Sequence, residues 1–183
     1  MKSIPLIVVL LAGSVLQPVK GQLFYTKNGK ISFFSRTPVE NIAADNNQVL
    51  SVLNLQAGTI QFSALNDAFY FPKARMQEDF EESYMETARY PKSVFKGTIA
   101  GADSVELGRD GNYPVTVTGD LTIHGITRRV TVPGQLTVDK GILSAKATFQ
   151  VFIRDFHIEI PSIISEKIAQ SIEITVSCNY IKN

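Results

Sequence analysis

Residues 112–138 contain two long runs in which apolar and polar side chains alternate. Because successive side chains of a strand point to opposite faces, each run predicts a strand with one buried and one exposed face. Each run covers roughly eleven residues, about twice the usual strand length, and His124-Gly125 separates the two. The pattern predicts a hairpin of a large, curved antiparallel sheet, and such sheets usually close into barrels that can enclose a cavity. The apolar face carries Tyr113, Val115, Val117, Gly119, Leu121 and Ile123 in the first run, and Ile126, Arg128, Val130, Val132, Gly134, Leu136 and Val138 in the second.

The first 21 residues have the pattern of a secretory signal peptide. A positive charge at Lys2 precedes the 13-residue apolar run Ile4–Leu16, and small residues follow near Gly21. As a helix this run would rise only about 20 Å, less than the roughly 30 Å hydrocarbon core of a bilayer. We therefore expect cleavage after Gly21, export to a periplasm or to the medium, and a single mature domain over residues 22–183. No transmembrane segment is expected after cleavage.

Charge and cysteine content narrow the class of protein further. Cleavage would leave 162 of the 183 residues and lower Lys plus Arg from 18 to 16, against 17 acidic residues. A net charge near −1 gives no electrostatic basis for binding nucleic acid. Cys178 is the single cysteine, so the apolar core has to hold the fold without an intrachain disulfide. Because Cys178 shares an apolar register with Val176 and Tyr180, it is expected to be a buried, unreactive thiol.

The rest of the chain predicts six more strands and one helix, a mainly β protein. The helix is expected over residues 73–88, between Pro72 and Pro91, because Met76, Phe80, Tyr84 and Ala88 follow at four-residue steps. This apolar stripe would lie across the mouth or the side of a barrel, and the last strand is expected to pair with the first. The further strands are predicted at residues 24–35 with a turn at Asn28-Gly29, 48–56, 58–71 with a bend near Asn66-Asp67, 93–100, 142–153 and 171–180.

Three motifs resemble the YceI-like family. The segment Gly119–Val132, GDLTIHGITRRVTV, is similar to the GDLTIHGxTRxV strand–turn–strand that recurs in that family. Tyr90-Pro91 after the predicted helix and Ile153–Phe156 (IRDF) follow the family pattern in the same order along the chain. The resemblance implies an extended, eight-stranded, lipocalin-like antiparallel β-barrel with one amphipathic helix packed against it. It also implies export and the binding of a long apolar chain, such as a polyisoprenoid or an isoprenoid quinone, in the lumen.

We therefore expect an exported lipid-binding protein that sequesters or carries an isoprenoid-type lipid. No reaction, catalytic residue, metal or cofactor is expected, and homodimer formation is left open. Which side chains face the lumen depends on strand register, since a slip of one residue reverses every assignment. The residues expected to contact the ligand are Phe33, Phe62, Phe69, Phe71, Met76, Phe80, Tyr84, Phe95, Leu121, Ile123, Phe149 and Phe156.

Two other classes of function stay open. A protein-binding barrel with a filled core would use the acidic face of the helix or an outer face of the sheet, in particular residues 48–56, which are apolar on both faces. A hydrolase or isomerase would use His124, which lies four residues from Asp120 and could form an acid–base pair with it. However, the chain lacks a Gly-x-Ser-x-Gly nucleophile motif, and its two histidines lack further zinc ligands nearby. We expect His124 to fix the hairpin turn by a hydrogen bond instead.

Arg128 is an exception to the alternating pattern because it falls on the apolar face of its strand. An unpaired guanidinium in an apolar environment is costly. We therefore expect Arg128 to pair with Asp120 or Asp155, with contact to a ligand head group at the barrel mouth as the alternative.

Overall fold

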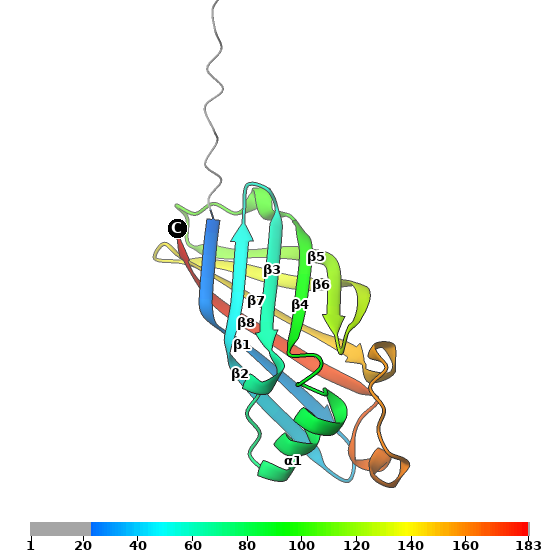
Figure 1. Ribbon diagram of the computed structural model, residues 1–183. Helices are drawn as coiled ribbons and strands as arrows, with labels where there is room; N and C mark the ends of the chain where they lie inside the picture. Colours follow the sequence, from blue (N-terminus) through cyan, green and yellow to red (C-terminus); the bar gives the residue numbers. More distant parts are fainter. Residues whose placement is uncertain (1–22, 183) are drawn as a thin grey trace, which may run out of the picture.

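Eight strands form a closed antiparallel barrel in the computed structural model, which describes residues 23–182 (Figure 1). Each strand pairs with its neighbours in sequence, and β8 pairs back onto β1 as predicted. The predicted signal peptide lies outside the described residues, so the boundary at Gly21 stays a prediction. The strands are β1 (Leu23–Arg36), β2 (Asn41–Asn54), β3 (Thr59–Leu65), β4 (Lys92–Ala100), β5 (Gly111–Ile123), β6 (Ile126–Asp139), β7 (Ile142–Phe152) and β8 (Ser171–Lys182).

Six short helical segments connect the strands. The chain termini of the described region lie together at one end of the barrel, and α1 lies at the opposite end (Figure 1). Within the part of the chain that the structure describes, no helix is long and apolar enough to cross a membrane. The helical segments are η1 (Asn66–Ala68), α1 (Ala74–Asp79), the π-helix η2 (Phe80–Tyr84), η3 (Ala102–Ser104), η4 (Ile153–Phe156) and η5 (Ser162–Lys167).

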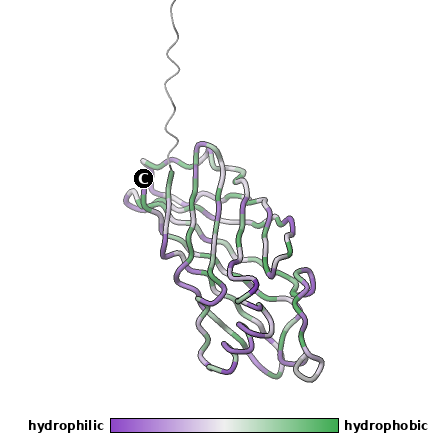
Figure 2. Tube along the Cα trace, viewed as in Figure 1, coloured by the Kyte–Doolittle hydropathy of each residue, from purple (hydrophilic) through white to green (hydrophobic). Residues whose placement is uncertain are grey.

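The hairpin predicted from the alternating pattern is confirmed. β5 and β6 pair in unbroken register from Gly111–Val138 to Ile123–Ile126. His124 and Gly125 form the two-residue turn with φ values of 49° and 73°, the left-handed conformation that suits the right-handed twist of a hairpin. Apolar residues alternate with polar ones along the strands in Figure 2. The alternation therefore assigned the inner and outer faces of this hairpin correctly.

The turn predicted at Asn28-Gly29 is wrong. β1 runs on from Leu23 to Arg36, and its register shifts between Thr26 and Ile31, which is a bulge and not a reversal. A Cβ on Gly29 would lie 2.7 Å from the Cys178 Sγ. Gly29 is needed because the bulged backbone approaches β8 too closely for a side chain. The sequence prediction had assigned the glycine to the positive φ angles of a hairpin turn instead.

The helix predicted over residues 73–88 is shorter than expected. α1 ends at Asp79, and the chain widens into the π-helix η2, where the Met85 N–H donates to the Phe80 carbonyl at 2.8 Å. Glu86 then adopts a φ of 43°, and the helix does not continue. The wider turn buries Met85 and leaves Ala88 exposed. The predicted bend near Asn66-Asp67 is confirmed, because β3 ends there in η1.

Candidate functional site

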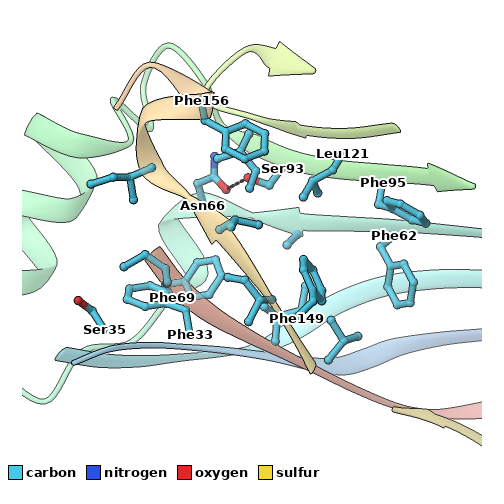
Figure 3. A pocket seen from close by; sticks show the side chains of 18 of the residues that line it. Phe33, Ser35, Phe62, Asn66, Phe69, Ser93, Phe95, Leu121, Phe149 and Phe156 are labelled. Carbon is cyan, nitrogen blue, oxygen red and sulfur yellow. Dashed lines mark hydrogen bonds between the residues drawn. The ribbon is translucent and has the colours of Figure 1, made fainter. Parts of the chain in front are cut away.

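The α1 half of the barrel is hollow. Its cavity has a volume of about 490 Å³ and is lined by inward-facing side chains of the strands and by η2. This volume lies within the usual range for ligand pockets, about 300–1,000 Å³. Figure 3 shows the lining, in which most of the labelled side chains are aromatic or aliphatic and Ser35, Asn66 and Ser93 are polar. Charged side chains such as Lys73, Arg75 and Lys167 border the cavity where it reaches the α1 end.

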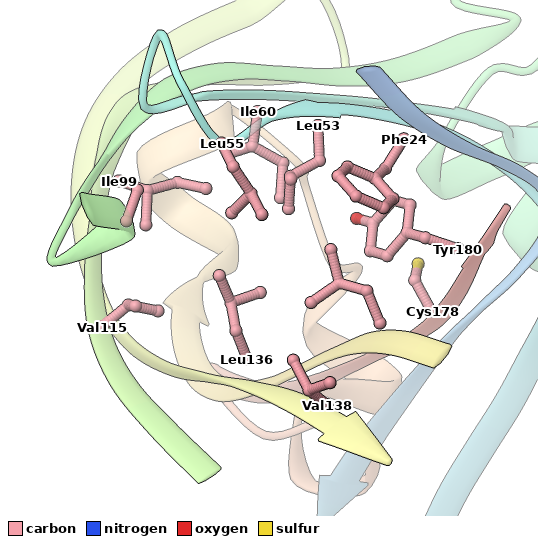
Figure 4. Packing of buried hydrophobic residues seen from close by; sticks show 12 residues of the cluster. Phe24, Leu53, Leu55, Ile60, Ile99, Val115, Leu136, Val138, Cys178 and Tyr180 are labelled. Carbon is pink, nitrogen blue, oxygen red and sulfur yellow. The ribbon is translucent and has the colours of Figure 1, made fainter. Parts of the chain in front are cut away.

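The opposite half of the barrel is filled with side chains. Leu53, Leu136 and Val138 meet on the barrel axis and are each 2% exposed or less. Figure 4 shows this cluster filling the space between the strands, with Phe24 and Tyr180 beside it. The lumen is therefore a blind cavity, closed by packed residues at the end where the termini lie.

Four phenylalanines hold α1 and η2 over the open half of the barrel. Phe80 of η2 lies with its ring centroid 5.6 Å from Phe33 of β1, 5.6 Å from Phe69 and 5.0 Å from Phe71. Phe33 in turn lies 5.6 Å from Phe69 and 5.5 Å from Phe71. Such ring pairs each contribute about 0.5–1.5 kcal/mol beyond the area they bury. We call these four residues the mouth cluster; it fastens the helical segment to the barrel and forms one wall of the cavity.

Glycines make room for an aromatic ring in the middle of the lumen. Gly97 of β4 and Gly119 of β5 are paired directly, and a Cβ on either would lie 2.6 Å from Cζ of Phe95. The Phe95 ring therefore lies over a part of the wall that has no side chains. Phe62 of β3 packs next to it at 6.3 Å between centroids. The flat position of Phe95 leaves the centre of the lumen open.

Three polar side chains inside the lumen are bonded to the protein itself. The Asn66 amide donates to the Tyr90 carbonyl at 2.7 Å, and the Ser93 hydroxyl donates to the Asn66 side-chain oxygen at 2.8 Å (Figure 3). The buried Ser35 hydroxyl oxygen accepts the Ala169 N–H at 2.9 Å. Because these groups already have partners, an apolar guest can occupy the lumen without leaving them unsatisfied.

Ion pairs keep the mouth of the cavity polar. The Lys73 Nζ donates to Glu40 at 2.7 Å, and this bond lowers the pKa of the Glu40 carboxyl. Arg75 pairs with Asp79 at 2.8 Å across one turn of α1. The cavity is thus apolar along its length and ringed by charges at one end, an arrangement that suits an amphipathic or wholly apolar guest.

Comparison with known families identifies the fold. The family model described as a YceI-like domain matches residues 17–180. The chain belongs to the YceI-like family. No curated protein matches the chain in sequence.

Solved structures resemble this YceI-like barrel at low sequence identity. A polyisoprenoid-binding domain from Saccharophagus degradans is 12% identical, with a TM-score of 0.78 over 90% of this chain and 100% of that one. Burkholderia cenocepacia BcnA is 17% identical, with a TM-score of 0.69 over 84% and 96%. The Campylobacter jejuni YCEI protein is 11% identical, with a TM-score of 0.54 over 100% and 99%. At these identities the likeness supports the fold.

All twelve residues that the sequence predicted as ligand contacts line the cavity of this YceI-like barrel. That they contact a ligand stays a prediction. They come from β1 (Phe33), β3 (Phe62), the segment after η1 (Phe69, Phe71), α1 (Met76), η2 (Phe80, Tyr84), β4 (Phe95), β5 (Leu121, Ile123), β7 (Phe149) and η4 (Phe156).

Other lining residues were not predicted as ligand contacts. Val130 and Val132 lie on the apolar face of β6, so the alternation predicted their inward position but not their place in the cavity wall. Ile158 and Ile168 lie outside regular elements, next to η4 and η5, where no periodic pattern marks an inner face. Met85 enters the lining because of the π-turn, for which the sequence has no local signal.

His124 joins three segments and does not pair with Asp120. Its Nε2 lies 2.9 Å from the Glu86 carboxylate, and its Nδ1 lies 3.3 Å from the Phe156 carbonyl. The Tyr90 ring packs edge-on at 4.5 Å. His124 therefore ties the hairpin turn to the end of η2 and to η4, a wider role than the predicted hydrogen bond within the turn. Among residues 23–182 no cluster of three or more His, Cys, Asp or Glu side chains could hold a metal ion.

The predicted pairing of Arg128 is wrong. Asp120 pairs with Arg129 at 3.1 Å on the outer face of the hairpin, and Asp155 lies 3.8 Å from its neighbour Arg154. Arg128 is exposed although it belongs to the inward register of β6. Its side chain reaches solvent and therefore avoids the cost of burial. Cys178 is buried as predicted, at 1% exposure, and burial raises the pKa of its thiol to about 11.

Proposed function

We propose that this protein binds an isoprenoid-type lipid in the barrel lumen and sequesters or carries it after export, without catalysing a reaction. The observation that carries the proposal is the blind, apolar cavity of about 490 Å³. Burial of apolar surface contributes roughly 25 cal/mol per Å², so several prenyl units would offset the cost of ordering the chain. The structural neighbour from Saccharophagus degradans is described as a polyisoprenoid-binding domain, which supports this class of ligand.

A second candidate function rests on the outer face of β2. Leu50 and Val52 are 50% and 45% exposed there, while Val49 and Leu53 fill the interior. The segment 48–56 is thus apolar on both faces, as a protein-binding barrel would require. The hollow lumen favours the lipid, because a barrel that bound partners through its outer face alone could have a filled core.

Extraction of the purified protein tests the proposal. We expect organic extracts analysed by mass spectrometry to contain a prenyl lipid, and added farnesol to raise the melting temperature of lipid-free protein. Clean extracts together with an unchanged melting temperature would contradict lipid binding. Turnover of a candidate substrate that His124→Ala abolishes would favour an enzyme instead.

A matched pair of variants locates the binding to the lumen. Val117→Phe adds a ring to a residue that lines the cavity, whereas Thr116→Phe adds the same ring to its outward-facing, exposed neighbour. We expect Val117→Phe to lose farnesol binding and Thr116→Phe to keep it. Equal binding by both variants would place the lipid outside the barrel.

A further inference from the structure

The backbone wall of the barrel is interrupted between β6 and β7. β5 and β6 pair through thirteen residues, but β6 and β7 pair through six, from Gly134–Ala147 to Asp139–Ile142. In the described chain, residues 126–133 of β6 have no ladder partner on the β7 side. Residues 148–152 of β7 pair with β8 alone. The two strands therefore separate over the α1 half of the barrel, where the cavity lies.

Pro133 is the sequence feature that ends the ladder. The next pair beyond Gly134–Ala147 would join Pro133 to Thr148, and proline has no N–H to donate. The pairing of β6 with β5 continues through Pro133 without a shift of register. The missing donor therefore affects the β7 side of the strand, where the separation begins.

Side chains, and not backbone hydrogen bonds, close this split. Val130 of β6 and Phe149 of β7 belong to one apolar cluster with the buried residues Val151 and Phe156. Val130 and Phe149 are half-buried and both line the cavity. The split is also bounded by η4, which lies against the start of β6 through the contact of the Phe156 carbonyl with His124.

The cavity extends to the strand pair that borders the split. Gln135 and Lys146 form the pair directly above it, and both are exposed residues of the outer face. Both also border the cavity. The exposed position of Arg128 on the inward register of β6 agrees with this interruption, because an intact wall would enclose its side chain.

The two ends of the barrel are less favourable routes for an apolar chain than the split. One end is filled by the buried cluster around Leu53 and Leu136. At the other end the mouth cluster packs Phe80 against three rings, and the ion pair Lys73–Glu40 lies beside it. Passage through the filled end requires the core to open, and passage through the α1 end leads an apolar chain past the ion-paired side chains that border the cavity there. Passage through the split requires rotation of a few side chains, which is intrinsically faster than segmental opening.

We propose that the β6–β7 split is a side gate through which the apolar chain of the ligand enters and leaves the lumen, with Phe149 as the gating residue. The inference rests on the proposed function, because a gate has a role only if a lipid occupies the lumen. It adds a route and a residue that controls the rate of exchange. The chain crosses the wall sideways, past Val130 and Phe149.

Exchange kinetics test the gate. The protein is loaded with a dansyl-labelled farnesyl probe, and its release is followed after addition of excess unlabelled farnesol. We expect Phe149→Ala to accelerate release by about tenfold, the effect of lowering a barrier by about 1.4 kcal/mol. The matched control is Phe62→Ala, which removes the same ring from β3, where the ladders on both sides are continuous. Rapid mixing of probe with lipid-free protein gives the association rate as well. Phe149→Ala should raise this rate, whereas Phe62→Ala should act mainly on release through a lower affinity.

A second variant closes the gate. Pro133→Thr restores the N–H that β6 lacks, so we expect this new amide to be protected from exchange by the Thr148 carbonyl and probe release to slow. Pro114→Thr is the matched control, since Pro114 is also an exposed strand proline but lies beyond the end of the β4–β5 ladder. The control should exchange the probe at the wild-type rate.

The outcomes separate the gate from the proposed function. Failure of the wild-type protein to take up farnesol contradicts lipid binding itself. Normal uptake with wild-type exchange rates in Phe149→Ala overturns the gate and leaves lipid binding intact. Faster exchange in Phe80→Ala but not in Phe149→Ala also overturns it, because the route would then pass under the helical segment.

Discussion

Removal of the Phe80 ring should loosen the helical segment from the barrel. Phe80 contacts Phe33, Phe69 and Phe71 at centroid distances of 5.6, 5.6 and 5.0 Å. None of the described residues of α1 is buried, so Phe80 is a principal apolar attachment of this segment. Replacement of Phe80 by alanine therefore removes ring contacts between the helical segment and the barrel. The strands of the barrel and their backbone hydrogen bonds stay unchanged.

The expected loss follows from the burial of the ring. Truncation of a fully buried phenylalanine costs about 3–5 kcal/mol, and Phe80 is half-buried. We therefore expect Phe80→Ala to lower the free energy of unfolding by about 2 kcal/mol, with the ring pairs included. For a domain of this size about 2–4 °C are lost per kcal/mol, which predicts a fall in Tm of about 4–8 °C.

Thermal unfolding followed by circular dichroism measures this change, and amide exchange locates it. We expect faster exchange at residues 74–85 than in the barrel strands. Tyr70→Ala is the control because Tyr70 precedes the same helical segment but is 68% exposed; its effect should stay within about 0.5 kcal/mol. Unchanged Tm and unchanged exchange in Phe80→Ala would refute the view that the mouth cluster fastens the segment. Phe80→Asp should also weaken farnesol uptake, and normal uptake would exclude Phe80 from the wall of the binding site.

Three further predictions concern the barrel itself. Gly119→Ala should destabilise the fold by about 1–3 kcal/mol because its Cβ would press on the backbone of β4, whereas Gly134→Ala, whose Cβ would have its nearest neighbour at 3.5 Å, should be nearly neutral in urea unfolding. The Ser32 hydroxyl donates to Asp45 at 2.6 Å and holds the pKa of that carboxyl below its ordinary 3.8. The hydrogen bond therefore adds to the free energy of unfolding above pH 3.8, and this contribution is lost as the pH falls through the lower pKa of the folded protein. In urea unfolding from about pH 2 to 7, the free energy of unfolding should be higher for the wild type than for Ser32→Ala at neutral pH, and the difference should shrink in acid. A difference that does not depend on pH would contradict the assignment. Cys178 should resist thiol reagents near pH 8 until the protein unfolds, because burial raises the pKa of its thiol to about 11; rapid labelling of the folded protein would show that this core opens.

The faces of the strands could be predicted from the sequence because the period of two is a local property of the backbone. Leu121 and Ile123 were placed inward by alternation alone, and both line the cavity. The pairing of Asp120 with Arg129 was missed although the hairpin encodes it. A two-residue turn at 124–125 puts Ile123 opposite Ile126 and therefore Asp120 opposite Arg129. The predicted pairing of Arg128 with an acid rested on the cost of burying Arg128 and did not use this register.

Side-chain contacts between distant segments could not be predicted. The stripe of Met76, Phe80 and Tyr84 correctly indicated which side of the helix is apolar, yet its spacing fits an α-helix through residue 88. The π-turn after Asp79 became visible in the folded chain, where Phe80 reaches three rings from other segments. The contact of His124 with Glu86 and with the Phe156 carbonyl likewise joins residues more than thirty positions apart.

By itself the sequence determined long strands with one apolar and one polar face and the hairpin turn at His124-Gly125, because alternation and turn residues act over a few residues. Tertiary structure alone decided how that interior is divided between packed side chains near Leu136 and open space near Phe95. The division depends on how the strands tilt and separate and on which glycines oppose each other, such as Gly97 and Gly119. Strand tilt and separation depend on packing throughout the barrel, so no single segment of the chain determines where the interior is filled and where it is open.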